Sequence, residues 1–115
     1  MQYALLIYRD ESVPQGTTEQ EQAQVSRDYW ALRSERGVTG GAGLHPAETA
    51  TTVRVQDGEV LITDGPFADT KEVFAGFYLL EADDIDRATE VASRIPAVRF
   101  GGVIEIRPVI ETPQS

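Results

Sequence analysis

The chain has 115 residues, with 10 basic and 19 acidic side chains, which gives a formal net charge of −9 at pH 7. This length fits one domain, and no linker, repeat or low-complexity stretch divides residues 1–115. Hydrophobic residues make up 41% and charged residues 25%, an ordinary globular composition that excludes global disorder. The chain has no cysteine and one histidine, which excludes disulfides, thiolate metal sites and a multi-histidine metal centre within one subunit.

Charge and hydropathy also exclude two classes of partner. Binding nucleic-acid phosphates needs clustered cations, and a chain with a pI near 4.4 lacks them. No run approaches the ~18 apolar residues of a membrane span, and the N-terminal segment lacks the basic region that opens a signal peptide. We therefore expect a soluble cytoplasmic protein that binds neither nucleic acid nor membranes and uses no metal or other cofactor.

In chain order, the first predicted element is a strand over residues 2–9 (QYALLIYR), where both faces are apolar. A strand covered on both sides lies in the middle of its sheet. A helix then begins after Thr18, whose hydroxyl caps the first turn, with Glu21 completing a capping box. Gly37 predicts the end of this helix. The apolar stripe of the helix consists of Val25, Tyr29 and Leu32, widened by Ala23 and Trp30.

Four strands are predicted in the middle of the chain. Residues 38–44 contain three glycines, which permit a bulge or a close approach by another backbone. Residues 51–56 and 59–64 are joined by Asp57-Gly58, a strong signal of a two-residue β-hairpin. Residues 73–80 (VFAGFYLL) are apolar on both faces and predict a second central strand.

The last two elements are a helix and an edge strand. The helix begins at Asp83 or Asp84 and ends before Pro96. Residues 103–109 alternate apolar and charged side chains, and Pro108 suits the edge of a sheet. The single apolar stripe of the helix consists of Ile85, Ala88, Ala92 and Ile95.

This order of elements predicts an α+β fold with a ferredoxin-like split β-α-β antiparallel sheet and an inserted β-hairpin. Right-handed crossovers place both helices on one face of the sheet. The opposite face then carries apolar side chains that nothing else in the chain covers, which is unusual for a monomer. We therefore expect a homodimer through this open sheet face. The alternative is that the hairpin folds back over it.

The most unusual local sequence is residues 64–72 (DGPFADTKE). It places three carboxylates beside Lys71, the only lysine of the chain. Such a cluster separates pKa values and can create an acid and a base. The structural alternative is a turn cap with a surface ion pair.

The same residues resemble the YCII-related family, in its DGPF branch, which is named for the tetrapeptide Asp64-Gly65-Pro66-Phe67. The resemblance implies a dimeric α+β barrel, in agreement with the burial argument. It implies no established reaction. Proteins of the wider family are associated with catalysis by a His–Asp pair. Some DGPF relatives occur alongside extracytoplasmic-function sigma factors, which implies a regulatory role instead. The other matching segments are residues 3–8 (YALLIY), Gly40-Gly41 with Leu44, residues 50–54 (ATTVR), 70–72 (TKE), 76–78 (GFY), 95–97 (IPA) and 104–109 (IEIRPV).

The site residues follow from these patterns. His45 lies after the glycine-rich strand, whereas the histidine of the wider family belongs to an earlier segment, and a loop histidine is usually solvated. Tyr8 and Arg9 end a central strand, where ligands often meet a sheet edge. The candidate catalytic residues are therefore Asp64, Lys71, Glu72 and His45, and the candidate substrate-binding residues are Tyr8, Arg9 and Phe67.

Two functions are compatible with the sequence. One is a cofactor-independent enzyme acting on a small molecule, with Asp64 as general acid or base and Lys71 as its charge partner. The other is a non-catalytic ligand-binding or regulatory dimer, whose acidic surface docks on a basic partner such as a sigma factor. The concentration of titratable groups in residues 64–72 favours the enzyme.

Overall fold

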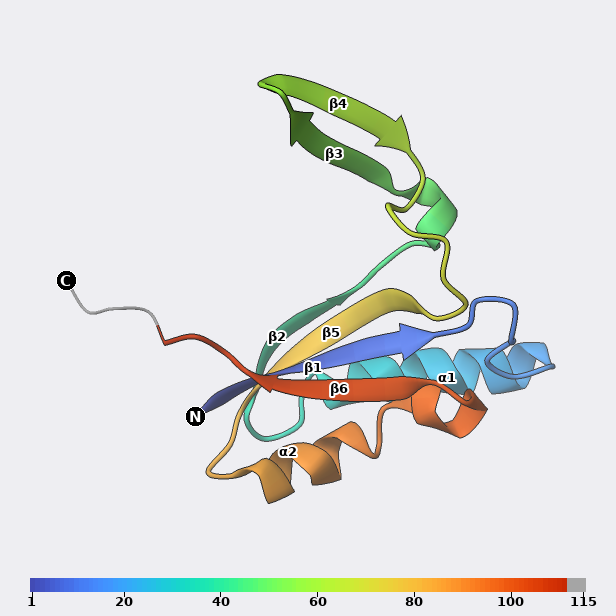
Figure 1. Cartoon of the computed structure of the whole chain (residues 1–115). Helices are drawn as coiled ribbons and strands as arrows, with labels where there is room; N and C mark the ends of the chain where they lie inside the picture. Colours follow the sequence, from blue (N-terminus) through green and yellow to red (C-terminus); the bar gives the residue numbers. More distant parts are fainter. Residues whose placement is uncertain (112–115) are drawn as a thin grey trace.

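A computed structural model describes residues 1–111, which form a four-stranded antiparallel sheet, two helices and a separate β-hairpin (Figure 1). Both helices lie on one face of the sheet. These features confirm the α+β class and the central positions of the two strands that are apolar on both faces. The sheet has the order β2 (Val38–Gly43), β5 (Val73–Glu81), β1 (Gln2–Arg9), β6 (Val103–Pro108). The remaining elements are α1 (Glu19–Leu32), α2 (Ile85–Ala92), the hairpin strands β3 (Thr51–Gln56) and β4 (Glu59–Asp64), and the 3₁₀ turns η1 (Ala47–Thr49) and η2 (Pro96–Phe100).

The hydrophobic core fills the space between the helices and one face of the sheet. Leu5, Leu80 and Ile95 are fully buried there. Alternate residues of β1 and β5 point toward the helices, as the period of a strand requires. The other large members of the core are Tyr3, Ile7, Leu32, Tyr78 and Val91.

Both helices end earlier than their predicted stop residues, Gly37 and Pro96, indicate. After Leu32 the chain tightens, because the amides of residues 33–35 each donate to the carbonyl three residues before them. Gly37 adopts a left-handed conformation (φ 93°), five residues beyond the last helical residue. The second helix ends at Ala92, so Ile95 is buried just before η2 rather than within the helix.

The helix starts are predicted more accurately. The amide of Glu21 donates to the hydroxyl of Thr18 at 3.1 Å, so the expected N-cap forms. The carboxylate of Glu21 accepts from the amide of Thr17 instead of closing the capping box on Thr18. Asp84 caps α2 by accepting from the amide of Arg87 at 3.0 Å. The predicted stripes are wrong for Ala23, Trp30 and Ile85, which are exposed.

Glycines allow β2 and β5 to approach closely. Gly41 has φ 148°, and a Cβ atom there would collide with the carbonyl oxygen of Phe77. Gly76 has φ 157°, and its Cβ would lie 2.6 Å from the carbonyl oxygen of Ala42. The predicted close approach of another backbone to the glycine-rich strand is therefore confirmed.

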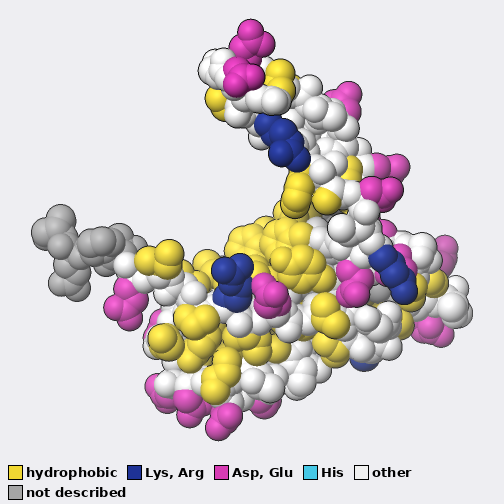
Figure 2. Space-filling view, in the orientation of Figure 1, with side chains coloured by type: hydrophobic (Ala, Val, Ile, Leu, Met, Phe, Trp, Pro, Cys, Tyr) yellow, Lys and Arg dark blue, Asp and Glu magenta, His cyan; other side chains and the backbone are white. Residues whose placement is uncertain are grey.

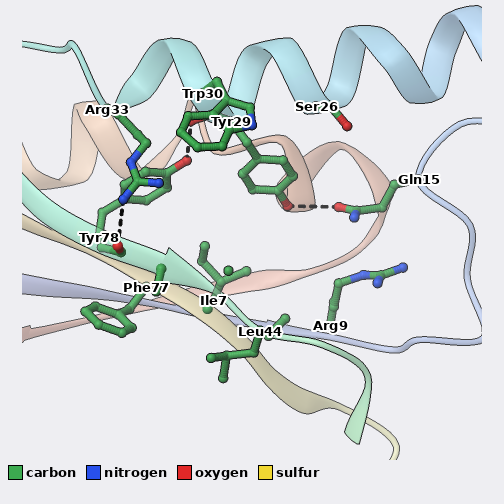
Figure 3. A pocket seen from close by; sticks show the side chains of 15 residues that line it. Ile7, Arg9, Gln15, Ser26, Tyr29, Trp30, Arg33, Leu44, Phe77 and Tyr78 are labelled. Atoms are coloured by element: carbon green, nitrogen blue, oxygen red, sulfur yellow. Dashed lines mark hydrogen bonds between the residues drawn. The ribbon is translucent and has the colours of Figure 1, made fainter. Parts of the chain in front are cut away.

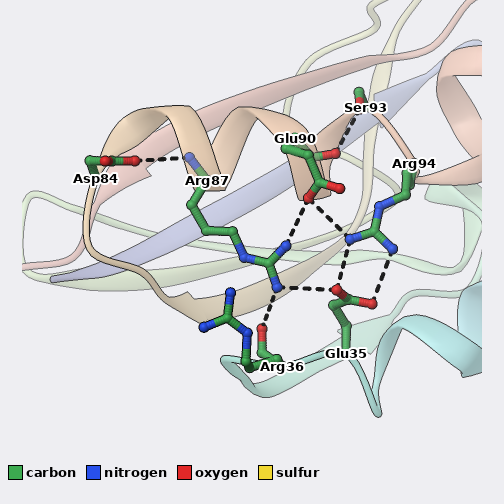
Figure 4. Close-up of polar contacts among 7 residues, drawn as sticks. All are labelled: Glu35, Arg36, Asp84, Arg87, Glu90, Ser93 and Arg94. Atoms are coloured by element: carbon green, nitrogen blue, oxygen red, sulfur yellow. Dashed lines mark hydrogen bonds and ion pairs between the residues drawn. The ribbon is translucent and has the colours of Figure 1, made fainter.

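An ion-pair network joins α2 to the segment that follows α1 (Figure 4). Arg94 donates to both oxygens of Glu35, at 3.0 and 2.8 Å, and Arg87 donates to the same carboxylate at 3.1 Å. Glu90 accepts from both arginines. The hydrogen bonds from Arg94 and then Arg87 lower the pKa of Glu35 to about 2.

The face of the sheet opposite the helices is open and apolar. Strand register places Ala4, Leu6 and Tyr8 of β1 on this face, opposite Leu79, Phe77 and Phe74 of β5. Figure 2 shows hydrophobic side chains gathered over the sheet. We call this surface the open face.

The hairpin leaves the open face uncovered. It rises away from the sheet in Figure 1, and every residue of β3 and β4 except Thr52 is exposed. The alternative in which the hairpin folds back over the sheet is therefore wrong. One side of the hairpin is itself apolar and consists of Val53, Val55, Val60 and Ile62, with 61–70% of each residue exposed.

We expect the Glu35 network to stabilise the fold in a pH-dependent way. Because the folded pKa of about 2 lies below the ordinary value of 4.5, the contribution is fully present above that value and is lost as the pH falls through 2. Glu35→Gln should lower the free energy of unfolding at pH 7, and the difference from wild type should shrink toward pH 2. Chemical denaturation across this range measures it, with the exposed Glu59→Gln as control. A difference independent of pH would contradict the assignment.

Gly41→Ala should destabilise the protein by about 1–3 kcal/mol, because the backbone strain at a positive φ adds to the collision with Phe77. Gly43→Ala is the matched control, since a Cβ there meets no atom within 4 Å. Thermal and chemical denaturation of both variants give the comparison. Equal stability of the two variants would show that the close approach at Gly41 is not required.

Candidate functional site

A pocket of about 560 Å³ lies between α1 and the edge of the sheet formed by β2 and β5 (Figure 3). We call it the α1 pocket. In the register of β2 and β5, Gly41 lies opposite Tyr78 and Gly43 lies opposite Gly76. Opposite residues of an antiparallel pair share a face, so these three glycines face α1 together with Tyr78. The pocket exists because they leave space where side chains would otherwise fill the layer beneath the helix.

The pocket has an apolar and aromatic lining with a few fixed polar groups. The hydroxyl of Tyr29 donates to Oε1 of Gln15 at 2.9 Å, and the hydroxyl of Tyr78 donates to the carbonyl of Tyr29 at 2.6 Å. These bonds position the two rings on the α1 side and the sheet side of the space (Figure 3). The apolar lining includes Ile7, Leu44 and Ala75. The side chain of Phe77 points to the open face, where its ring stacks on that of Phe74.

The two tyrosines keep their protons at neutral pH. Burial raises the pKa of Tyr78 to about 12, with a smaller contribution from Tyr29. Burial also raises the pKa of Tyr29. Both phenols are therefore hydrogen-bond groups and not bases in this pH range.

The charge of the lining is positive in an acidic protein. Arg9 and Arg33 line the pocket, and no aspartate, glutamate, lysine or histidine does. Within residues 1–111, neither arginine forms an ion pair. Arg33 donates to the carbonyl of Gly41 at 3.0 Å and lies 4.8 Å from the ring centroid of Trp30. Arg9 donates to the carbonyl of Val13 at 2.7 Å.

The predicted site residues do not converge. Asp64 ends β4, in register with Thr51 of the hairpin, and it is exposed. Lys71 and Glu72 are exposed as well, and none of the three takes part in an ion pair within residues 1–111. His45 is exposed and directly follows Leu44 of the pocket lining.

The predicted substrate-binding residues separate in the same way. Arg9 lines the α1 pocket. Tyr8 points to the open face, where its ring centroid lies 5.6 Å from that of Phe74. Phe67 is 78% exposed. Five lining residues were not predicted from the sequence as site residues: Gln15, Ser26, Tyr29, Arg33 and Tyr78.

One sequence signal could have located the pocket. Three glycines, at positions 41, 43 and 76, lie on strands that pack beneath the same helix, and glycines leave space there.

Within the described range 1–111, no three His, Asp or Glu side chains are grouped closely enough to hold a metal ion. None of the helices in that range is both long and apolar enough to span a bilayer.

Fold and pocket together define a small α+β protein with a ligand-sized space beneath its first helix. The chain belongs to the YCII-related family, because the sequence profile of the YCII-related domain matches residues 1–113. It is also 38% identical over 114 residues to an uncharacterised protein of Rhizobium meliloti (strain 1021), an alignment that covers 95% of this chain and 92% of that protein.

The fluorescence of Trp30 should be a probe of the pocket, because Trp30 lies in the lining and is the only tryptophan of the chain. Its side chain is 66% exposed. We expect emission close to that of a solvated indole and efficient quenching by acrylamide. Arg33→Gln removes the cation beside the ring and should change the emission, whereas Arg54→Gln on the hairpin should not. Blue-shifted emission that resists quenching would contradict this position of the side chain.

Proposed function

We propose that this YCII-related protein is a homodimer that binds a small organic molecule in the α1 pocket. The lining of that pocket carries the proposal. Its volume of about 560 Å³ falls within the range of roughly 300–1,000 Å³ that is usual for ligand sites, which combine apolar walls with a few placed polar groups. Tyr29, Trp30 and Tyr78 supply aromatic surface, and Gln15 with the two arginines supplies the polar groups.

Binding is better supported than catalysis by the same lining. General acid–base catalysis near neutral pH relies on groups such as histidine, lysine or a carboxylate, and the lining has none of them. A catalytic role for Asp64 requires its exposed side chain to meet a ligand, together with Lys71 and Glu72. These residues lie outside the lining, so the acid–base proposal is the second candidate.

The dimer is proposed from surface that one chain leaves exposed. The Cα radius of gyration is 16.3 Å, against about 13 Å for a compact chain of this length. The accessible surface is 8194 Å², against about 6,200 Å² for a compact monomer of this mass. The excess of roughly 2,000 Å² per chain, or roughly 4,000 Å² for two chains, is of the size that obligate homodimers bury in total.

The strand order supports a ferredoxin-like arrangement, and two open faces packed together would complete a dimeric α+β barrel. The pair of Glu105 and Arg107, 4.0 Å apart, is in register with Leu6 and Ala4 on the open face. In a two-fold dimer each member of that pair can meet the opposite charge of the partner. Assignment to the DGPF branch rests on the tetrapeptide from Asp64 to Phe67.

Leu79→Lys should convert the dimer into protomers, because it places a charge in the middle of the open face. Sedimentation velocity should give twice the protomer mass of 12.6 kDa for wild type and the protomer mass for the variant. Val98→Lys, in η2, is the control and should leave the dimer intact. A wild-type protein that sediments as a protomer at micromolar concentration contradicts the proposal.

Gly43→Leu should block the pocket, because a side chain at this position extends toward α1 into open space. Gly43→Ala at the same position is the control that leaves most of the space open. Aromatic fragments that bind wild type in ligand-observed NMR should bind the leucine variant at least about tenfold more weakly and the alanine variant nearly unchanged. Unchanged binding to the leucine variant would place the ligand elsewhere.

A further inference from the structure

We propose that the ligand of the α1 pocket is an organic carboxylate with an aromatic body, held through its carboxylate by Arg9, Gln15 and Ser26. This inference rests on the proposed function and names the chemical class of the ligand. Arg9, Gln15, Ser26 and Tyr29 also line a second hollow of about 360 Å³ next to the first. They therefore lie where the two spaces meet, and we call them the polar end of the pocket.

The polar end offers several hydrogen-bond donors that no protein group engages. Arg9 carries five N–H groups, and one of them is bonded to Val13. Oε1 of Gln15 accepts from Tyr29, which leaves its amide nitrogen as a donor. Within residues 1–111, no hydrogen bond engages the amide nitrogen of Gln15 or the hydroxyl of Ser26. A carboxylate can accept from all of these donors, and its negative charge strengthens the bonds from Arg9, so it matches this set better than a cationic amine or a neutral alcohol does.

The neighbouring carboxylates are already engaged elsewhere. Asp10 accepts from the amide and hydroxyl of Ser12, at 2.9 and 2.6 Å. Glu11 accepts from the amide of Ala47 in η1, at 3.1 and 3.2 Å. Arg9 is thus followed by two acidic residues and pairs with neither. In a chain with 19 acidic and 10 basic residues, this leaves its charge available to an anionic ligand.

The rest of the pocket suits an aromatic body. In Figure 3, Tyr29 lies between Arg9 and Arg33. Ile7 and Ala75 line the sheet side of the same space. Arg33 lies against Trp30 at the other end and adds to the positive potential. An aromatic ring can pack on these walls while its carboxylate reaches the polar end.

Benzoate and benzamide are the matched probes, because they share shape and differ in charge. Ligand-observed NMR should show that wild type binds benzoate at least about tenfold more tightly than benzamide. Arg9→Gln should remove this preference while leaving benzamide binding unchanged, and Arg54→Gln, which removes the same charge from the hairpin, should have no effect. Ser26→Ala should weaken the binding of benzoate but not that of benzamide. Because Ser26 is exposed, this variant should fold, and it tests the proposal even if the Arg9 variant does not fold.

The pH dependence separates an arginine site from a histidine site. Arginine stays protonated, so benzoate affinity should be constant between about pH 6 and 9. A loss of affinity with rising pH in this range contradicts an arginine site. Equal affinity for benzoate and benzamide, both abolished by Gly43→Leu, overturns the carboxylate inference and leaves the proposed function standing. Binding of neither probe, or binding that is insensitive to Gly43→Leu, overturns both.

Discussion

The close backbone approach of β2 and β5 is the constraint on which the rest of the structure depends. Gly41 and Gly76 permit it, because side chains at either position would collide with the facing strand. The same glycines, with Gly43, contribute no side chain to the layer beneath α1. The residues that hold these two strands together therefore also create the pocket. We therefore expect a side chain added at Gly41 to lower stability, and a side chain added at Gly43 to reduce the space for a ligand.

The placement of both helices on one face of the sheet gives the molecule two surfaces of different character. On the helix side, the α1 pocket combines aromatic rings with Arg9 and Arg33. On the other side lie the open face and the apolar side of the hairpin, in a chain whose total accessible surface exceeds that of a compact monomer. We assign ligand binding to the first surface and association of two copies to the second. The two roles are separable, because the substitutions that test them lie on opposite faces.

The sequence predicts the strands well, because alternate residues of a strand point to opposite faces and their polarity shows which faces are buried. Residues 2–9 are apolar on both faces and form the central strand β1 with the predicted bounds. Helix ends are predicted less well, since the tightening after Leu32 depends on backbone hydrogen bonds that side-chain periodicity does not encode. The position of the candidate site is predicted least well. The density of charged residues drew attention to 64–72, whereas the pocket depends on missing side chains and on residues that only the fold brings together. Arg9 was identified because it ends a central strand.

The central claim is that ligand binds beneath α1, in the space that the glycines leave. The most direct measurement is a map of backbone amide chemical shifts of ¹⁵N-labelled protein during addition of benzoate. We predict the largest changes at Gly41, Gly43 and Gly76, and at Gln15 of the polar end, with the hairpin unaffected. Changes confined to residues 64–72 or to the hairpin, with these glycine signals unmoved, would contradict the account.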